Sequence, residues 1–305
     1  MAEVKDSTIL IQDVETKNIM TKSTLPVGGY SVNPYVGCTH GCKYCYASFM
    51  KRFTGHTEPW GTFLDVKHWP AIKNPQRYHG QRIVIGSVTD GYLPQEAQFQ
   101  NTRKLLAQLR GSGAEILICT KSDLVIRDID LLKELGKVTV SWSINTLDEG
   151  FKNDMDNAVS ISRRLEAMKQ VYEAGIRTVC FIAPVFPGIT DFEAIFHRVR
   201  NQCDLIWLEN LNLRGGFKKD ILDYIRNKYP ELTALYDAIY NKADKSYFRG
   251  LEAQAEHIAK EYSCPFVDNE LPYGRAEPGH PVIVDYFYHE EVRGSENSGQ
   301  RRPKR

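Results

Sequence analysis

Three cysteines lie close together in one short segment, Cys38-Thr-His-Gly-Cys42-Lys-Tyr-Cys45. The C-x3-C-x2-C spacing can hold three thiolates in one tight loop. Three such soft ligands bind three irons of a cubane [4Fe–4S] cluster and leave the fourth iron open. An open iron can bind and activate a ligand, whereas a cluster held by four cysteines mostly carries electrons. The segment therefore predicts a reactive iron–sulfur centre with Cys38, Cys42 and Cys45 as its ligands.

Other metal centres fit the cysteines less well. A zinc site that included His40 would need a residue inside the loop to fold back on the metal, and no second close pair of ligands occurs. A ferredoxin would need a dedicated fourth cysteine. The remaining cysteines are scattered singly at Cys119, Cys180, Cys203 and Cys264. The alternative that stays open is a non-catalytic iron–sulfur or zinc protein that acts as a redox sensor or partner-binding module.

Composition describes a globular chain without a dominant charge. The 305 residues are 42% apolar, enough for one sizeable domain with a small extension. A net charge of +1, from 39 basic and 38 acidic residues, gives no general attraction to nucleic acid or an anionic membrane. No stretch approaches the roughly 20 apolar residues of a membrane span. Single cysteines, an oxygen-sensitive cluster and the lack of a signal-peptide pattern predict a cytoplasmic protein.

Short apolar runs alternate with amphipathic segments from residue 82 onward. The runs cover residues 82–88, 115–119, 138–144, 177–183 and 204–208. Such alternation predicts a parallel sheet with helices between its strands. With a first strand at 31–36, the pattern predicts an α/β fold, a partial (β/α)6 TIM-type barrel. Cys38 then follows the carboxyl end of the first strand, where α/β barrels carry out their chemistry.

The chain is expected to divide into four parts. Residues 1–30 form a lead-in, and residues 31–215 form the barrel core. Residues 216–293 form a C-terminal extension of helices and strands. Residues 294–305 form a disordered basic tail that ends in Arg-Arg-Pro-Lys-Arg.

The segment from Asn33 to Ala47 resembles the radical S-adenosylmethionine (SAM) superfamily, in the branch of spore photoproduct lyase. Later segments match in order, at 86–96, 120–132 and 141–146, so that the resemblance covers about residues 33–213. More narrowly, the chain resembles the radical SAM mobile pair proteins. These are encoded beside a second radical SAM protein, which makes such a protein a candidate partner here.

The resemblance implies two cofactors, a [4Fe–4S] cluster and SAM. The amino and carboxylate groups of SAM would chelate the open iron, and one electron would split SAM into methionine and a 5′-deoxyadenosyl radical. That radical abstracts hydrogen from a substrate, while the protein binds, orients and shields. The electron would come from a flavodoxin- or ferredoxin-type donor. Peptide and nucleic acid both remain open as substrates.

The resemblance also indicates cofactor-binding residues beside the cluster and on the second strand. Tyr44 and Tyr46 are suited to the adenine face. Ser87, Thr89 and Asp90 follow the second strand and are expected to bind the SAM ammonium, where a carboxylate is best placed. The alternative is that Asp90 simply binds the backbone of a strand-ending turn.

Further cofactor contacts are expected from the third and fourth strands. Lys121 ends the third strand and is expected to hold the SAM carboxylate. Ser143 and Asn145 end the fourth strand and are expected to bind ribose hydroxyls.

One departure from the family pattern concerns the returning hydrogen atom. Spore photoproduct lyases carry a cysteine after the second strand, whereas this chain reads Gly-Ser-Val-Thr-Asp at 86–90. Thymine-dimer repair by that route is therefore not expected. Cys119 and Cys180 are alternative hydrogen donors, although a buried cysteine in a strand usually fills apolar space. Glu209 follows the sixth strand and is a candidate to reach substrate.

Overall fold

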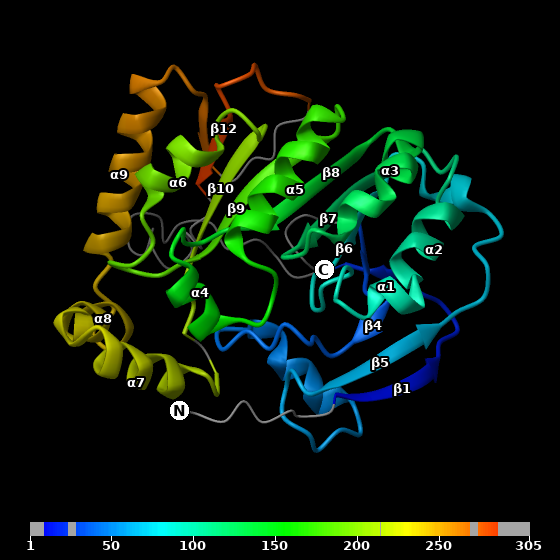
Figure 1. Cartoon of the computed structure of the whole chain (residues 1–305), viewed down its shortest axis with the longest axis horizontal. Coiled ribbons are helices and arrows are strands. Elements are labelled where there is room, and N and C mark those ends of the chain that lie inside the picture. Colours follow the sequence, from blue (N-terminus) through cyan, green and yellow to red (C-terminus); the bar gives the residue numbers. More distant parts are fainter. Residues whose placement is uncertain (1–8, 24–28, 214, 269–273, 286–305) are drawn as a thin grey trace, which may run out of the picture.

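The computed structural model describes residues 9–23, 29–213, 215–268 and 274–285 (Figure 1). The predicted basic tail, 294–305, lies outside these residues. In the part that is described, no helix is long and apolar enough to cross a membrane.

The main sheet has the strand order β11-β12-β10-β9-β8-β7-β6-β3-β2. Its central strands, from β3 to β10, are all parallel. They are β3 (Tyr30–Val32), β6 (Arg82–Ile85), β7 (Glu115–Thr120), β8 (Val138–Ser143), β9 (Arg177–Val185) and β10 (Leu205–Asn210). Within the described chain this gives six β/α units in an open sheet, which confirms the α/β fold of a partial barrel.

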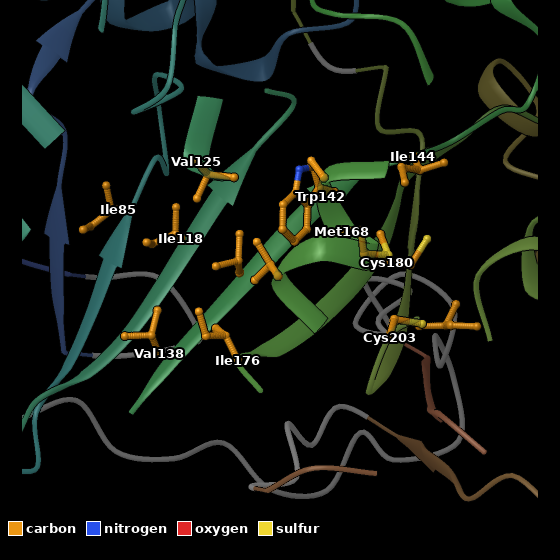
Figure 2. Close-up of a cluster of buried hydrophobic side chains, with 14 of the residues drawn as sticks. Ile85, Ile118, Val125, Val138, Trp142, Ile144, Met168, Ile176, Cys180 and Cys203 are labelled. Carbon is orange, nitrogen blue, oxygen red and sulfur yellow. The ribbon is translucent and has the colours of Figure 1, made fainter. Parts of the chain in front are cut away.

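One face of the main sheet is covered by helices (Figure 1). They are α2 (Asn101–Gln108), α3 (Ile129–Leu135), α5 (Ile161–Glu173), α6 (Phe192–Val199) and α9 (Ser246–Glu261). Alternate strand residues point into this core, and Figure 2 shows Ile118, Trp142 and Cys180 in the same cluster as Met168 of α5. Because strand side chains alternate between faces, their neighbours Cys119, Ser141 and Ser143 lie on the other, inner face.

The predicted first strand, 31–36, is broken into two. It consists of β3 and β4 (Tyr35–Val36), separated by Asn33 and Pro34. Pro34 lacks the N–H that a continuing strand would use, and the Asn33 side chain accepts a hydrogen bond from Val88 N at 3.1 Å. The chain therefore leaves the main sheet just before the cysteine loop.

The departing strand β4 joins a second, three-stranded sheet of order β1-β5-β4. β5 (Phe63–His68) pairs antiparallel with β4 and parallel with β1 (Leu10–Glu15). The lead-in 1–30 thus contributes a strand that the sequence pattern did not indicate, because β1 is almost wholly exposed and lacks an alternating apolar face.

The C-terminal extension belongs partly to the main sheet. β12 (Val282–Asp285) pairs parallel with β10, and β11 (Phe266–Asp268) pairs with β12. The helices α7 (Lys218–Lys228) and α8 (Thr233–Tyr240) pack with α4 (Glu149–Met155) in a separate apolar cluster. The remaining short elements are β2 (Thr21–Lys22), η1 (Tyr46–Phe53), η2 (Pro75–Tyr78), α1 (Glu96–Phe99), η3 (Leu124–Asp128) and η4 (Pro230–Leu232).

Candidate cluster and cofactor site

The cysteine loop connects β4 to η1 at the carboxyl end of the parallel strands. Two backbone turns shape it, with Gly41 N donating to Cys38 O and Cys45 N donating to Cys42 O, both at 3.1 Å. The Thr89 hydroxyl, just beyond β6, donates to Gly37 O at 2.5 Å. All three thiols are free; Cys38 is buried and the other two are half-buried. Thr89, predicted to bind cofactor, therefore anchors the start of the loop.

Asp90 joins this loop to the main sheet. Within the described chain its Oδ2 accepts from His40 Nε2 at 2.9 Å and from Lys121 N at 2.7 Å. Its Oδ1 accepts from Tyr92 N and Thr120 Oγ1, both at 2.8 Å. Burial opposes ionisation, but the hydrogen bonds from His40 and the backbone outweigh it and lower the pKa of Asp90. Through these bonds Asp90 positions the loop, and its expected contact with the SAM ammonium stays a prediction.

The opposite side of the loop is held by the junction of α4 and α5. Lys43 N donates to Met155 O at 2.9 Å, and Asn157 N donates to His40 O at 2.8 Å. The intervening Asp156 forms a buried ion pair with Arg164 at 2.8 Å. Two structural segments therefore clamp the loop, one from the ends of β6 and β7 and one from the α4–α5 junction.

The Asp156–Arg164 pair also reaches the sheet and the loop. Arg164, fully buried, donates to Ser143 O at 3.1 Å. The Tyr44 hydroxyl donates to Asp156 at 3.4 Å. Sequence reasoning missed Asp156, since nothing in the local pattern marks an aspartate whose partner lies on the next helix.

Lys121 and Tyr44 meet beside Cys42. The Lys121 ammonium lies 5.7 Å from the centroid of the Tyr44 ring. Burial lowers the pKa of Lys121, but Cys42 and Asp156 raise it by more, so that its charged form is favoured. Tyr44 is itself buried and packs edge-to-face on Phe186 at 5.4 Å between centroids. The structure thus brings the predicted Lys121 to the cluster loop and places Tyr44 in an apolar cluster.

The other predicted cofactor contacts make internal hydrogen bonds at the strand ends. The Ser87 hydroxyl pairs with that of Ser31 at 2.5 Å, and the Tyr46 hydroxyl donates to Ser87 O. Asn145 Nδ2 donates to Pro184 O at 3.3 Å. Ser143 is half-buried at the end of β8.

The two hydrogen-donor candidates lie on opposite faces of the sheet. Cys180 is fully buried in the helix-side core with Met168 (Figure 2), so its placement argues against a role at the site. Cys119 lies on the inner face, where burial and the charge of Asp90 raise its pKa to about 12. The charge of Glu209, from β10, also raises the pKa of Cys119. Burial raises the pKa of Glu209 itself to about 7.

The donor atoms of the loop fit a multi-iron cluster better than a single metal ion. Across the described residues, no three His, Cys, Asp or Glu side chains are arranged to hold a single metal ion. The donor set is three soft thiols, which suits a multi-iron cluster. The indole N–H of Trp60 donates to the Cys45 sulfur and lowers the pKa of that thiol, although burial raises it by more. A donor of this kind stabilises the thiolate form that ligates a cluster.

Comparison with known proteins decides the family. The profile of the radical SAM superfamily matches residues 32–199. The chain belongs to the radical SAM superfamily. An uncharacterized protein of Methanocaldococcus jannaschii is 34% identical over 239 residues, which cover 78% of this chain and 89% of that protein. The radical SAM Nα-GlyT isomerase of Pseudomonas phage M6 is 26% identical over 177 residues, which cover 57% of this chain and 35% of that protein.

Solved structures show the same fold. Spore photoproduct lyase complexed with dinucleoside spore photoproduct superposes with a TM-score of 0.52 at 16% identity. The match covers 72% of this chain and 66% of that one. For a radical SAM protein, the family implies a [4Fe–4S] cluster and SAM as cofactors, and Cys38, Cys42 and Cys45 occupy the expected motif.

Proposed function

We propose that this protein is a radical SAM enzyme that binds one [4Fe–4S] cluster through Cys38, Cys42 and Cys45. The bound cofactors supply reductive cleavage of SAM to a 5′-deoxyadenosyl radical, which abstracts a hydrogen atom from the substrate. One observation carries the proposal: three free thiols share a loop that Asp90 and Asp156 hold at the carboxyl ends of the parallel strands. That edge is where α/β sheets place their ligands.

The residues around the loop divide the work between positioning and binding. Asp90 and His40 fix the loop against β6 and β7, while Arg164 and Asp156 fix it against α5. Lys121 is proposed to hold the SAM carboxylate, because its half-buried side chain reaches the cluster loop, with the ammonium 5.7 Å from the centroid of the Tyr44 ring. A carboxylate suits this place because charge-assisted hydrogen bonds are stronger than neutral ones.

Glu209 is proposed to face the substrate. It follows Leu208 at the end of β10, and it acts electrostatically on Cys119 across the inner face. No hydrogen bond or ion pair engages its carboxylate among the described residues. A half-buried carboxyl of this kind is suited to a hydrogen-bond donor on the substrate, which peptide amides and nucleobases both provide.

The proposal is tested by anaerobic reconstitution with iron and sulfide, followed by reduction with dithionite in the presence of SAM. We expect 5′-deoxyadenosine, detected by mass spectrometry, from the native protein. Cys42→Ala should abolish it. Cys264→Ala, which removes a buried thiol outside the loop, should retain it. A fully loaded native protein that forms no 5′-deoxyadenosine would favour the redox or partner-binding alternative.

A further inference from the structure

Aromatic side chains are exposed along η1, the short helix that directly follows Cys45. Phe49 is 43% exposed and Phe53 is 68% exposed. Their rings meet edge-to-face at 6.4 Å, and the Arg52 guanidinium lies 5.2 Å from the Phe49 centroid and 4.8 Å from that of Phe53. We call Phe49, Arg52 and Phe53 the η1 patch. Exposed aromatics ordered around an arginine are typical of the centre of a binding surface.

The charge around the η1 patch is positive. The first turn of η1 has no acidic residue, and its last turn carries Lys51 and Arg52. Lys51 donates to the Thr57 carbonyl at 2.8 Å and so keeps its charge near the patch. The carboxylates beyond η1, Glu58 and Asp65, are both engaged by His56. Such a surface is complementary to an acidic protein face.

The η1 patch lies near a cluster ligand. Cys45 immediately precedes η1, and a helix of this type rises about 2 Å per residue, which puts Phe49 about 8 Å and Phe53 about 16 Å along the axis from Cys45. Cys38 is buried, whereas Cys45 is half-buried. A protein seated on the patch would therefore approach the cluster without entering the fold.

The far end of η1 is turned toward the second sheet. Met50 and Phe53 line a hollow of about 500 Å³ together with Val14 of β1 and Asp65 of β5. The side chains expected to face SAM and substrate, Lys121 and Cys119, come instead from the main sheet. A substrate must reach that inner face, whereas a protein that only delivers an electron need not. The position of the patch favours the electron donor over the substrate.

We propose that the η1 patch is the docking surface for a small, acidic one-electron carrier protein. The proposal rests on the proposed function, because a cluster that must be reduced before each cleavage needs a donor. The carrier loses one electron and the cluster gains it, and no bond or proton passes between the proteins. Electron-transfer complexes of this kind are weak and bury less than about 1,200 Å², which a patch of this size can provide.

Flavodoxin is the probe for the test, with Arg52→Glu as the test variant. Binding of oxidised flavodoxin to the cluster-loaded protein is measured by calorimetry at low salt. Formation of 5′-deoxyadenosine is then measured with reduced flavodoxin and, separately, with dithionite. Lys133→Glu is the matched control, since it makes the same charge change on an exposed residue of α3. Phe53→Ser removes apolar surface without changing charge.

We expect Arg52→Glu and Phe53→Ser to weaken flavodoxin binding about tenfold and to slow flavodoxin-driven turnover correspondingly. Lys133→Glu should change neither, and all variants should match the native protein with dithionite. Native flavodoxin affinity in Arg52→Glu, or no binding by the native protein, would overturn the proposal. The proposal would also be overturned if Arg52→Glu weakened only the binding of a single-stranded oligonucleotide. That result would assign the patch to nucleic acid. Failure with dithionite in the native protein would instead refute the proposed function, while the binding data would still decide the docking.

Discussion

The carboxylate of Asp90 accepts hydrogen bonds from the cysteine loop, from the turn after β6 and from the end of β7. Asp90→Asn keeps the shape but removes the charge and replaces one acceptor with a donor. We expect the free energy of unfolding to fall by about 2–4 kcal/mol, because buried charged hydrogen bonds are lost. Urea unfolding and the iron bound per chain after reconstitution are the measurements, and both values should fall.

The matched control for this change is Asp130→Asn. Asp130 also pairs with a cation, Arg103, but its side chain is 54% exposed. Exposed pairs contribute about 0–1 kcal/mol, so the control should bind iron normally. Equal iron binding by Asp90→Asn and Asp130→Asn would show that Asp90 does not position the loop.

Glu209 makes stability depend on pH. Burial raises its pKa from 4.5 to about 7 in the folded state, so the folded chain holds a proton that the unfolded chain has lost between these values. Stability should therefore fall as pH rises through this window, by at most about 3 kcal/mol. Glu209→Gln removes this dependence. The free energy of unfolding, measured with urea, should differ between native and variant protein by more at pH 8 than at pH 5. The same difference at both pH values would refute the raised pKa of Glu209.

At the scale of the elements, the cysteine loop depends on close backbone contact with the turn before β5. Gly61 has φ +102, and a Cβ there would lie 2.9 Å from the Gly41 Cα in the loop. Gly215 has φ +106, but a Cβ there meets nothing within 4 Å. The two glycines therefore share the same backbone constraint and differ in the contact.

Gly61→Ala should consequently be more harmful than Gly215→Ala. The positive φ destabilises both variants. The clash at Gly61 should lower the free energy of unfolding by about 1–3 kcal/mol more, and it should displace the loop. Thermal unfolding and iron content measure the two effects. A similar loss of thermal stability and of bound iron in both variants would mean that the loop tolerates displacement at Gly41.

The elements that the sequence could predict are those with a repeating pattern. The buried strands from β6 to β10 read as continuous apolar runs, and the helices between them have clear amphipathic faces. The pattern does not predict the break at Asn33 and Pro34, because a side chain that caps a strand leaves no periodic signal. It does not predict the exposed strand β1 either, because pairing with a distant strand leaves none. The cysteine spacing predicts the ligand loop without any periodic signal, because the constraint on three neighbouring ligands is local.

The site could be predicted only in part. Lys121 was placed correctly near the loop because a strand end fixes its position in the sheet. The bond from Tyr92 N to Asp90 fits the predicted strand-ending turn, whereas the bonds from His40 and Lys121 come from segments that meet only in the complete fold. Asp156 and Arg164 join two helices, the loop and β8 through a contact that only tertiary structure reveals.

At the scale of the whole molecule, the main sheet runs without interruption from the core into the C-terminal extension. Asp204, fully buried before β10, accepts from Thr178 N at 2.9 Å and pairs with Arg275 at 2.7 Å. Asp204→Ala would remove the ion-pair partner of Arg275 and leave Thr178 N, at the start of β9, without the acceptor that Asp204 provides. We expect a loss of 3–5 kcal/mol or so in the free energy of unfolding.

Because β12 pairs with β10, the core and the extension should unfold in one shared transition, and this loss should lower its temperature. Calorimetry should show a single transition at a lower temperature in Asp204→Ala. Two separated transitions, with only one of them shifted, would show that the extension folds independently of the core.

We propose that the cysteine loop holds a cluster whose open iron binds SAM. The most direct measurement is the EPR spectrum of the reconstituted, dithionite-reduced protein with and without SAM. We predict the signal of a reduced [4Fe–4S] cluster that changes when SAM is added and is absent from Cys42→Ala. A fully formed cluster whose signal is the same with and without SAM would show that its open iron does not bind SAM.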